Sequence, residues 1–485
     1  MANTVKSPCS GGFFYYQKRR LVQIKHGVII IGGGVAGYVA AIRGKQLGLD
    51  VAVVESDKLG GTCLHRGCIP TKALLESART FRTILKGKTF GILCDNVQID
   101  FAKIQAYKNQ VVKRLHQGLN NIFKRERIPV YSGIARLLNN KVIEIAQPYG
   151  GKISLEAEQA LVLATGSKPR NIHLTRTDSQ RVLTTDQALK LEKQPKSIII
   201  VGGGVIGVEF ASLYSDLGIP VTLIEQEDSL LVHGDQEIQK EIYRQFVNRG
   251  IKVLLNTSIT DIQEQKQQII VTTDNQHEQE VIGDYCLICI GREANINNLG
   301  LEYLNIELTN GFVKVNSVYQ TSEPNLFAIG DVIGGKMLAH AASYQGIRVM
   351  EYLAGVLDPH DSRQAPIPAC IYSNPEIASI GLTEHQANQQ GYKIKVSKFS
   401  LQANGKAVVA NESGFVKLIA DAETDDLLGA HLIGPQATEL ISVISVGMFL
   451  DASSWELSRV IYPHPTVSEA LGEAALALNS GAIHG

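Results

Sequence analysis

Apolar residues first cluster in a short run near the start of the chain. Val28–Ile31 leads directly into Gly32-Gly33-Gly34-Val35-Ala36-Gly37, and a helical pattern then continues to Gly48. A second apolar run, Val51–Val54, ends at the acidic residue Glu55. Short apolar runs on either side of a helical pattern predict a strand, a helix and a second strand.

The same pattern occurs a second time, much later in the chain. Ser197–Val201 leads into Gly202-Gly203-Gly204-Val205-Ile206-Gly207, a helix is expected to about Gly218, and Val221–Ile224 ends at Glu225. In both copies the acid lies at the same distance from the first glycine. The repeat predicts an α/β fold with two Rossmann-like dinucleotide-binding domains.

Each position in these units has a physical reason. The first glycine forms the tight turn, the second lets the backbone approach a pyrophosphate at the helix N-terminus, and the third lets the helix pack on the strand. The final carboxylate accepts hydrogen bonds from the ribose of an adenosine. The expected cofactor contacts are therefore Gly32, Gly34, Gly37 and Glu55 in the first unit, and Gly202, Gly204, Gly207 and Glu225 in the second.

Glu225 also indicates which nicotinamide cofactor binds. A carboxylate at this position bonds the 2′-hydroxyl of NAD, whereas the 2′-phosphate of NADP requires an arginine. The next residues are Gln226, Glu227 and Asp228, with no base among them. The sequence therefore favours NAD.

Two cysteines, Cys63 and Cys68, follow the first unit in the segment GGTCLHRGCIPTK. Their C-x4-C spacing does not match the C-x2-C of zinc sites. A regular helix would separate their Cα atoms by roughly 8–9 Å, whereas a disulfide needs about 4.4–6.8 Å. A bond between them would need a distorted turn, which Gly67 and Pro70 allow, and strained disulfides are readily reduced. The nearby Lys72 would stabilise a thiolate, although two unrelated buried cysteines stay an alternative.

The other cysteines show no such arrangement. Cys286 and Cys289 lie in the apolar run Tyr285–Ile290, which is typical of a buried strand, so we interpret them as structural. Seven cysteines in 485 residues do not form a disulfide scaffold and indicate a reducing compartment. The remaining ones have no candidate partners nearby: Cys9, Cys94 and Cys370.

Composition and charge narrow the function further. Lys+Arg and Asp+Glu number 47 each, so no net field attracts nucleic acid, and no apolar run is long enough to span a membrane. The first 26 residues are basic and lack acids, which indicates an N-terminal extension expected to be disordered, with a targeting peptide as the alternative. We expect the protein in the cytoplasm.

From about residue 27 to the C-terminus the chain resembles the flavoprotein disulfide reductases, most closely those members that oxidise dihydrolipoamide. Besides the cysteine segment, the motifs that carry this resemblance are Ala164-Thr165-Gly166, Gly291-Arg292, Ala328-Ile329-Gly330-Asp331, Leu338-Ala339-His340-Ala341 and Tyr462-Pro-His-Pro-Thr-Val-Ser-Glu469. The resemblance implies FAD and NAD as cofactors and a C-terminal α+β dimerisation domain. It also implies a homodimer that acts on lipoyl domains of 2-oxo acid dehydrogenase complexes or of the glycine cleavage system.

The resemblance implies roles for single residues. Cys63 would exchange with the substrate, Cys68 would lie against the flavin, and Lys72 would sit near the flavin, paired with Glu209. His464, supplied by the partner subunit, would be the general acid–base. Glu469 would orient His464, although a capping box with Thr466 is an alternative reason for this acid. The remaining cofactor contacts would be Thr62, Gly133, Gly166, Gly291, Asp331 and Ala339.

Five positions depart from the family pattern without removing an assigned group. They loosen the choice of disulfide substrate, and Tyr462 in particular could change the polarity of the pocket. Alternatives are an NAD(P)H-dependent disulfide reductase such as glutathione reductase, a mercuric reductase, or a non-catalytic flavoprotein subunit of a multienzyme complex. Glu225 argues against glutathione reductase, and no cysteine follows Cys370 to form the C-terminal pair of a mercuric reductase. The departures are His65, Thr71, Ala294, Gln345 and Tyr462.

The motif order predicts a domain plan. Residues 27–174 would form the FAD-binding domain, completed by a central segment at 291–362. The NAD-binding domain would span 175–290 and the dimerisation domain 363–485, after the extension at 1–26.

Overall fold

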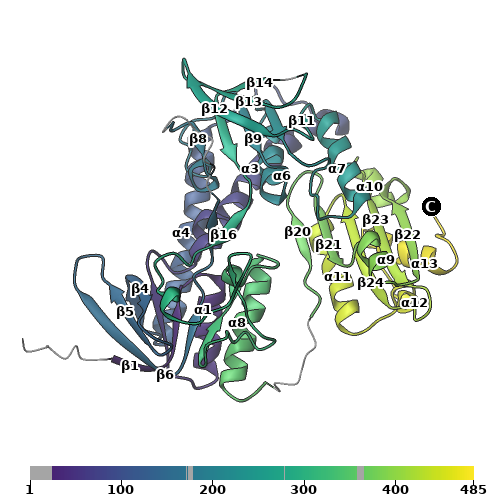
Figure 1. Ribbon diagram of the computed structural model, residues 1–485. Helices are drawn as coiled ribbons and strands as arrows, with labels where there is room; N and C mark the ends of the chain where they lie inside the picture. The colour runs from purple at the N-terminus through teal and green to yellow at the C-terminus, as the bar shows by residue number, and fades with distance from the viewer. Residues whose placement is uncertain (1–23, 171, 173–178, 278, 358–364) are drawn as a thin grey trace, which may run out of the picture.

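The computed structural model describes residues 24–170, 172, 179–277, 279–357 and 365–485. Figure 1 shows two α/β parts, one built on the N-terminal strands and one on the middle of the chain, and a C-terminal part beside them. Most of the expected N-terminal extension, residues 1–23, lies outside the described residues. The expected division into domains stays a prediction.

The first sheet has the order β3-β2-β1-β6-β5-β4. β19 pairs in parallel with the last residues of β6, Leu161–Leu163. The run Val28–Ile31 is almost completely buried, as expected for a central parallel strand covered on both faces. Helices α1 (Val35–Gln46) and α8 (Ala339–Leu353) pack against each other beside this sheet (Figure 1). The strands are β1 Ile24–Ile31, β2 Val51–Glu55, β3 Val130–Ser132, β4 Ile134–Leu137, β5 Val142–Ala146, β6 Lys152–Leu163 and β19 Leu326–Ala328.

Three helices follow β2 before the chain returns to the sheet. The short α2 (Gly61–Arg66) is followed after one residue by α3 (Cys68–Lys86), and the 3-10 turn η1 (Gly87–Phe90) ends this segment. The long α4 (Phe101–Arg125) packs against α3 and is capped by the side chain of Asp100. Helix α3 also contacts α6 of the second α/β part, so it connects the two.

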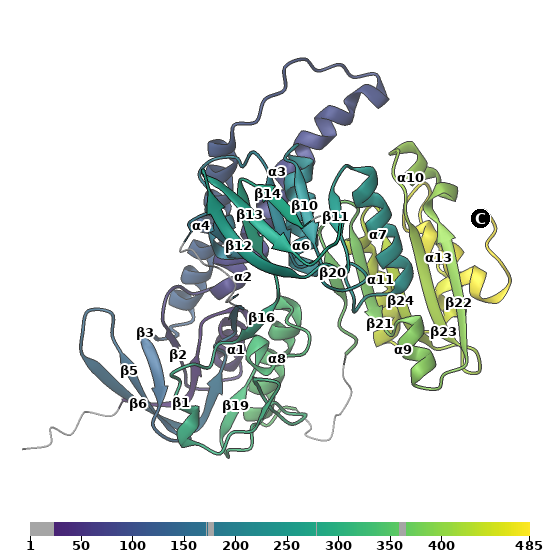
Figure 2. The same ribbon diagram turned by 45° about the horizontal axis from the view of Figure 1, so that its top comes forward.

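The second α/β part repeats the parallel architecture, with the strand order β11-β10-β9-β15-β8. A three-stranded antiparallel sheet, β12-β13-β14, packs beside it (Figure 2). Its strands are β8 Val182–Leu183, β9 Ile198–Val201, β10 Val221–Ile224, β11 Lys252–Leu254, β15 Tyr285–Ile288, β12 Ile259–Gln265, β13 Gln268–Thr273 and β14 Glu280–Gly283. Its helices are α5 Thr185–Ala188, α6 Val205–Asp216 and α7 Gln236–Asn248.

Cys286 and Cys289 are both buried, in and directly after β15. Burial raises the pKa of the Cys286 thiol to about 12. The predicted buried strand is confirmed, and the structural role of this C-x-x-C pair stays a prediction.

Small elements join the first part to the second. β7 (Ser167–Pro169) pairs with β16 (Arg292–Ala294), so the chain leaves and re-enters the first part through adjacent strands. The other short elements are η2 Leu301–Tyr303, β17 Leu308–Thr309, β18 Phe312–Val313 and η3 Gly330–Ile333.

The C-terminal part is an antiparallel sheet, β20-β21-β24-β23-β22, covered by helices. Its strands are β20 Ala369–Ile371, β21 Ile377–Gly381, β22 Ile394–Ser400, β23 Phe415–Asp421 and β24 Leu427–Ile433. Its helical elements are α9 Glu384–Gln389, η4 Leu401–Ala403, α10 Gly405–Val409, α11 Ala437–Phe449, α12 Ser454–Arg459 and α13 Glu469–Asn479. Among the described residues no helix is both long and apolar enough to cross a membrane.

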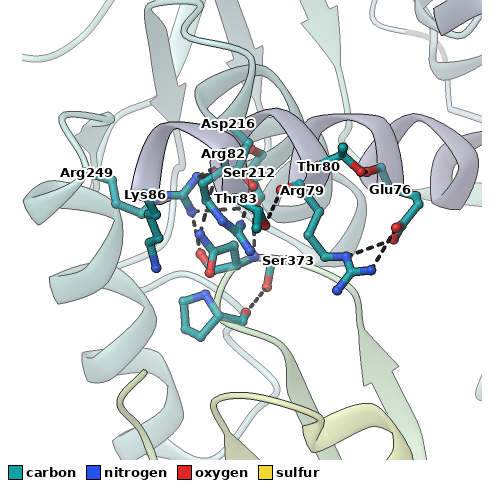
Figure 3. Close-up of polar contacts among 12 residues, drawn as sticks. Glu76, Arg79, Thr80, Arg82, Thr83, Lys86, Ser212, Asp216, Arg249 and Ser373 are labelled. Atoms are coloured by element: carbon teal, nitrogen blue, oxygen red, sulfur yellow. Dashed lines mark hydrogen bonds and ion pairs between the residues drawn. The ribbon is translucent and has the colours of Figure 1, made fainter. Parts of the chain in front are cut away.

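A buried carboxylate marks the place where the three parts meet. Asp216, at the end of α6, accepts hydrogen bonds from Arg82 of α3 and from Arg249, which follows α7, each at 2.6 Å (Figure 3). Arg249 also donates to the backbone carbonyl of Asn374 in the C-terminal part. Because each arginine shares this one acid, the network fixes α3 against α6 and the C-terminal part.

Candidate active site

The two glycine turns are superimposable in their local geometry. Gly32 and Gly202 have φ of 108° and 107°, a conformation that other residues rarely adopt. A Cβ atom on Gly37 would lie 1.8 Å from the carbonyl oxygen of Gly32, and one on Gly207 would lie 1.9 Å from that of Gly202. The first and third glycines are therefore required by the turn and by helix packing, as the motif predicts.

The second glycine of each motif, Gly34 or Gly204, faces open space instead. A Cβ atom on Gly204 would have no heavy atom within 4 Å, and one on Gly34 would meet only the Cα atom of Gly61, at 3.8 Å. Both glycines cap a helix N-terminus, where free N–H groups attract anions. The open space and the free donors fit the pyrophosphate of a dinucleotide.

The acids at the ends of β2 and β10 are held in the same way. One oxygen of Glu55 accepts from the N–H of Gly33 (2.7 Å), and one oxygen of Glu225 accepts from that of Gly203 (2.5 Å). The other oxygen of each accepts from the N–H two residues further along, at 2.7 and 2.9 Å. The repeat seen in the sequence thus extends to individual hydrogen bonds.

A cavity of about 660 Å³ opens beside Glu55. Gly133 directly follows β3 at this place, and its N–H donates to the carbonyl oxygen of Glu55 (2.9 Å). A cavity next to this carboxylate fits the adenosine half of FAD. Other residues that line it include Lys58, His116, Lys124, Arg127 and Ser132.

Thr165, which follows β6, carries a buried hydroxyl with no hydrogen-bond partner among the described residues. A Cβ atom on Gly32 would lie 3.2 Å from the Thr165 nitrogen, so the backbone of Thr165 lies against the first glycine turn. Gly166 next to it faces open space. An unpaired donor at an anion-binding turn is what a bound diphosphate would satisfy.

Asp331, in η3, is held by a chain of polar contacts. The hydroxyl of Ser167 donates to Asp331 (2.5 Å) and accepts from Nε of Arg292 (2.7 Å). Gly291, one residue before this arginine, has a φ of 108° with open space around it. Ala339 is the first residue of α8, so its N–H lies at a helix N-terminus. These positions leave one oxygen of Asp331 and the start of α8 available to a cofactor.

Four residues that the sequence analysis did not assign to the site contribute to it. The amide oxygen of Gln345 accepts from the N–H of Gly330 at 2.7 Å, which fixes the loop that carries Asp331. Nothing in the sequence indicated that Gln345 belongs to the site, whereas the other three residues lie in or beside recognised motifs. These others are Thr165, Ser167 and Arg292.

The two cysteines lie on either side of a break in the helix. Cys63 is in α2 and Cys68 begins α3, and Gly67 between them has φ −146° and ψ −112°. A Cβ atom on Gly67 would lie 3.2 Å from the carbonyl oxygen of Thr62, so α2 passes close to this residue. The predicted distorted turn is confirmed at Gly67, whereas Pro70 lies within the first turn of α3.

Both cysteines are free thiols that interact with each other. A hydrogen bond from Cys63 lowers the pKa of Cys68 to about 7, and the charge of Lys72 acts in the same direction. The same contact and burial raise the pKa of Cys63. Cys68 is therefore the thiol of the pair that becomes a thiolate near neutral pH.

Lys72 lies one turn after Cys68 on α3. Its Nζ atom donates to both oxygens of Glu209 in α6 at 2.8 Å. The Glu209 side chain is buried and that of Lys72 is about one-third exposed. The predicted pair is therefore formed, and it joins the two α/β parts next to the cysteines.

His464 and Glu469 form a second group at the start of α13. Nδ1 of His464 and Oε1 of Glu469 are 2.9 Å apart, and Oε2 of Glu469 accepts from the N–H of Thr466 (2.8 Å). The hydrogen bonds from Thr466 and His464 lower the pKa of Glu469. The helix begins at Glu469, so only the Thr466 N–H half of the capping box is formed, and one carboxylate serves both contacts.

The structure does not bring this histidine to the cysteines of the same chain. Its side chain is 78% exposed, and α13 lies in the C-terminal part, away from α3 in both views (Figures 1 and 2). Ile461, three residues earlier, is 94% exposed, and Phe449 and Leu450 of the same part are also exposed. Large exposed apolar side chains are typical of an interface.

Three departures from the family pattern have local explanations. Tyr462 packs its ring against Gly472 of α13 and donates to the carbonyl oxygen of Leu457, so it anchors the loop before His464. Thr71 donates to the carbonyl oxygen of Gly67 at 2.7 Å. Nε2 of His65 lies 2.9 Å from a backbone carbonyl oxygen in the loop before α2.

Comparison with known proteins places the chain in a family. Residues 26–346 match the pyridine nucleotide-disulphide oxidoreductases, and residues 367–475 match the dimerisation domain of the same family. A dihydrolipoyl dehydrogenase of Bacillus subtilis is 45% identical over 95% of this chain and 99% of its own length. One from Zymomonas mobilis is 37% identical over 94% and 98%.

Solved structures agree with this placement. LpdA from Mycobacterium tuberculosis has a TM-score of 0.86 at 26% identity and covers 94% of this chain and 99% of its own. The HOCl-induced flavoprotein disulfide reductase RclA from Escherichia coli has a TM-score of 0.83 at 27% identity, with 93% and 99% covered. The chain belongs to the pyridine nucleotide-disulphide oxidoreductase family. It is an oxidoreductase with FAD and NAD as cofactors and a dimerisation domain.

Proposed function

We propose that this protein is a dihydrolipoyl dehydrogenase, which oxidises dihydrolipoamide to lipoamide and reduces NAD⁺. The observation that carries the proposal is the paired thiols, with Cys68 beside Lys72 at the junction of two dinucleotide-binding units. The full-length similarity to dihydrolipoyl dehydrogenases supports the choice of substrate.

The reaction begins as a thiol–disulfide exchange at the oxidised cysteine pair. One sulfur of dihydrolipoamide attacks Sγ of Cys63, forms a mixed disulfide and releases Cys68 as a thiolate. The second substrate thiol then attacks the mixed disulfide, which releases lipoamide and Cys63. Two electrons pass from the substrate to the cysteine pair, which ends as a thiolate at Cys68 and a thiol at Cys63.

The remaining proton goes to a base at the site. His464 of the partner subunit takes it, because an imidazole titrates close to neutral pH. Glu469 holds Nδ1 of that histidine at 2.9 Å, which leaves Nε2 free to accept the proton. Exposure of His464 in the single chain supports a role across the dimer interface.

The cofactors complete the electron transfer. When bound, FAD would supply the acceptor for the electron pair of the cysteines, and NAD⁺ would supply the final hydride acceptor. The glycine turn at residues 32–37, Glu55, Thr165 and Asp331 would hold FAD, and the turn at 202–207 with Glu225 would hold NAD. Lys72 keeps a positive charge beside the Cys68 thiolate.

The protein-bound form of the substrate follows from its chemistry. Dihydrolipoamide carried on a lipoyl domain of a 2-oxo acid dehydrogenase complex or of the glycine cleavage system presents a dithiol on a flexible arm. We include these domains in the proposal as partners of the homodimer.

The test is NADH formation by the purified holoenzyme with dihydrolipoamide and NAD⁺, followed by absorbance. We expect rapid turnover by the wild type, loss of turnover in Cys68→Ser, and full turnover in Cys94→Ser, which changes an exposed cysteine outside the site. If the wild type holds FAD and oxidises NADH with another disulfide but not with lipoamide, the proposed substrate is wrong.

A further inference from the structure

Tyr372, from the segment that follows β20, contacts the Lys72–Glu209 pair from the C-terminal part. The Nζ atom of Lys72 lies 4.6 Å from the centre of the Tyr372 ring. The backbone N–H of Tyr372 donates to Oε1 of Glu209 at 3.0 Å. All three parts of the molecule therefore contribute to this contact, and Tyr372 of the C-terminal part touches both Lys72 and Glu209.

The segment that carries Tyr372 is fixed on α6. The N–H of Asn374 donates to the hydroxyl of Ser212 (2.7 Å), and Arg249 donates to the carbonyl oxygen of Asn374. Glu209, Ser212 and Asp216 are spaced three and four residues apart, so they line one face of α6. Figure 3 shows Ser212, Asp216, Arg249 and Ser373 in this cluster. The backbone that carries the Tyr372 ring is thus hydrogen-bonded to α6 at two points.

Although Lys72 is paired with Glu209, its side chain is not fully buried. Its side chain is about one-third exposed. A lysine has a flexible four-carbon side chain and a strongly hydrated ammonium group, so it can adopt other rotamers that point to solvent. Cys68 lies four residues earlier on α3, which places the two side chains on the same face of the helix. A cation over an aromatic face gains an attraction that does not use up its hydrogen-bond donors.

We propose that Tyr372 is a positioning residue, whose ring holds the Lys72 ammonium beside the Cys68 thiolate. Glu209 alone would attract the ammonium towards α6, and the ring adds a second contact that limits its position. The inference rests on the proposed function only in treating Cys68 as the working thiolate. Other groups that act on Cys68 are Cys63 of α2, Glu209 of α6, Tyr38 of α1 and Arg292 of β16.

The experiment measures the titration of Cys68 directly, without dihydrolipoamide. In a Cys63→Ser background, which keeps a hydroxyl donor for Cys68, the reduced holoenzyme is treated with iodoacetamide at a series of pH values. Mass spectrometry of the peptide that contains Cys68 gives its modification rate. We compare Tyr372, Tyr372→Phe and Tyr372→Leu.

We expect Tyr372→Leu to move the midpoint to higher pH, with modification about two- to fivefold slower below the midpoint. Tyr372→Phe keeps the ring and should titrate like the parent. Tyr392→Leu is the matched control, because Tyr392 lies in the same part and is also 40% exposed. An unchanged midpoint in Tyr372→Leu, or an equal shift in Tyr372→Phe, would overturn the proposal.

The two proposals can fail independently. If the Tyr372→Leu shift appears but the wild type does not oxidise dihydrolipoamide, the positioning role holds and the substrate is wrong. If dihydrolipoamide is oxidised and the shift is absent, the proposed substrate is right and the positioning role of Tyr372 is wrong. Thermal unfolding of each variant, compared with Tyr392→Leu, separates a local effect from a general loss of structure.

Discussion

Single side chains at this site work by fixing their neighbours. Glu469 binds the ring of His464 with one oxygen and the N–H of Thr466 with the other, so the imidazole cannot rotate freely. Lys72 and Cys63 act on Cys68 in a comparable way, by a charge and by a hydrogen bond. Substitutions of these groups should therefore change protonation and geometry more than folding.

His464→Gln should lower dihydrolipoamide oxidation by about 10²- to 10⁴-fold, because it removes the general base. Glu469→Gln should cost less than this, because its amide oxygen can still accept from Thr466 while the orienting charge is lost. Steady-state kinetics measure both, and unchanged FAD absorbance in each variant shows that the fold is retained. Full turnover by His464→Gln would contradict the assigned role.

The thiolate of Cys68 should form with a midpoint near pH 7 in the reduced protein, whereas the pKa of an ordinary cysteine is about 9. Because this pKa is depressed, the thiolate is present above pH 7 and lost as pH falls through 7. Cys63→Ala removes the largest cause and should raise the midpoint, whereas Cys63→Ser should retain much of the shift. Thiolate absorbance against pH checks this, and identical midpoints in all three proteins would oppose it.

Among the elements, the two strand–turn–helix units are the proposed cofactor sites. Their turns have the same glycine conformation and the same carboxylate hydrogen bonds, but they lie in different sheets. In the proposed function, this duplication would let one protein hold two dinucleotides, each at a helix N-terminus. It also allows the two sites to be damaged separately.

Gly37→Ala should prevent FAD binding, because its Cβ atom would lie 1.8 Å from a backbone oxygen. Gly207→Ala should leave FAD bound but abolish NAD⁺ reduction, because the same clash, at 1.9 Å, occurs in the second unit. Flavin absorbance and NADH formation distinguish the two outcomes. Gly118→Ala is the control, since the same substitution in α4 meets open space. Loss of FAD in Gly207→Ala would contradict the assignment of FAD to the first unit and NAD to the second.

The sequence predicted these elements well because their signals are local. Glycine spacing, short apolar runs and the break required by the C-x4-C pair are all contained in stretches of a few residues. Contacts between distant residues were not predictable in this way. Gln345, interpreted as a departure that loosens specificity, supplies the acceptor for Gly330, and Tyr372 reaches Glu209 across 163 positions of the chain.

At the scale of the whole molecule, the proposed mechanism requires a site that one chain does not complete. The thiols lie between the two α/β parts, whereas His464 is exposed on the C-terminal part next to apolar side chains. The dimerisation domain provides the means to bring the two together. The sequence could suggest this arrangement only through family resemblance, because no spacing within one chain encodes a contact between two.

The most direct test of the account is complementation between subunits in the dihydrolipoamide-to-NAD⁺ assay. Cys63→Ala and His464→Gln chains with different affinity tags are co-expressed, and the mixed dimer is purified through both tags. The account predicts that each homodimer has almost no turnover, while the mixed dimer regains one intact site and about half of the wild-type rate per dimer. A mixed dimer as inactive as both homodimers would contradict a dithiol site built from two subunits.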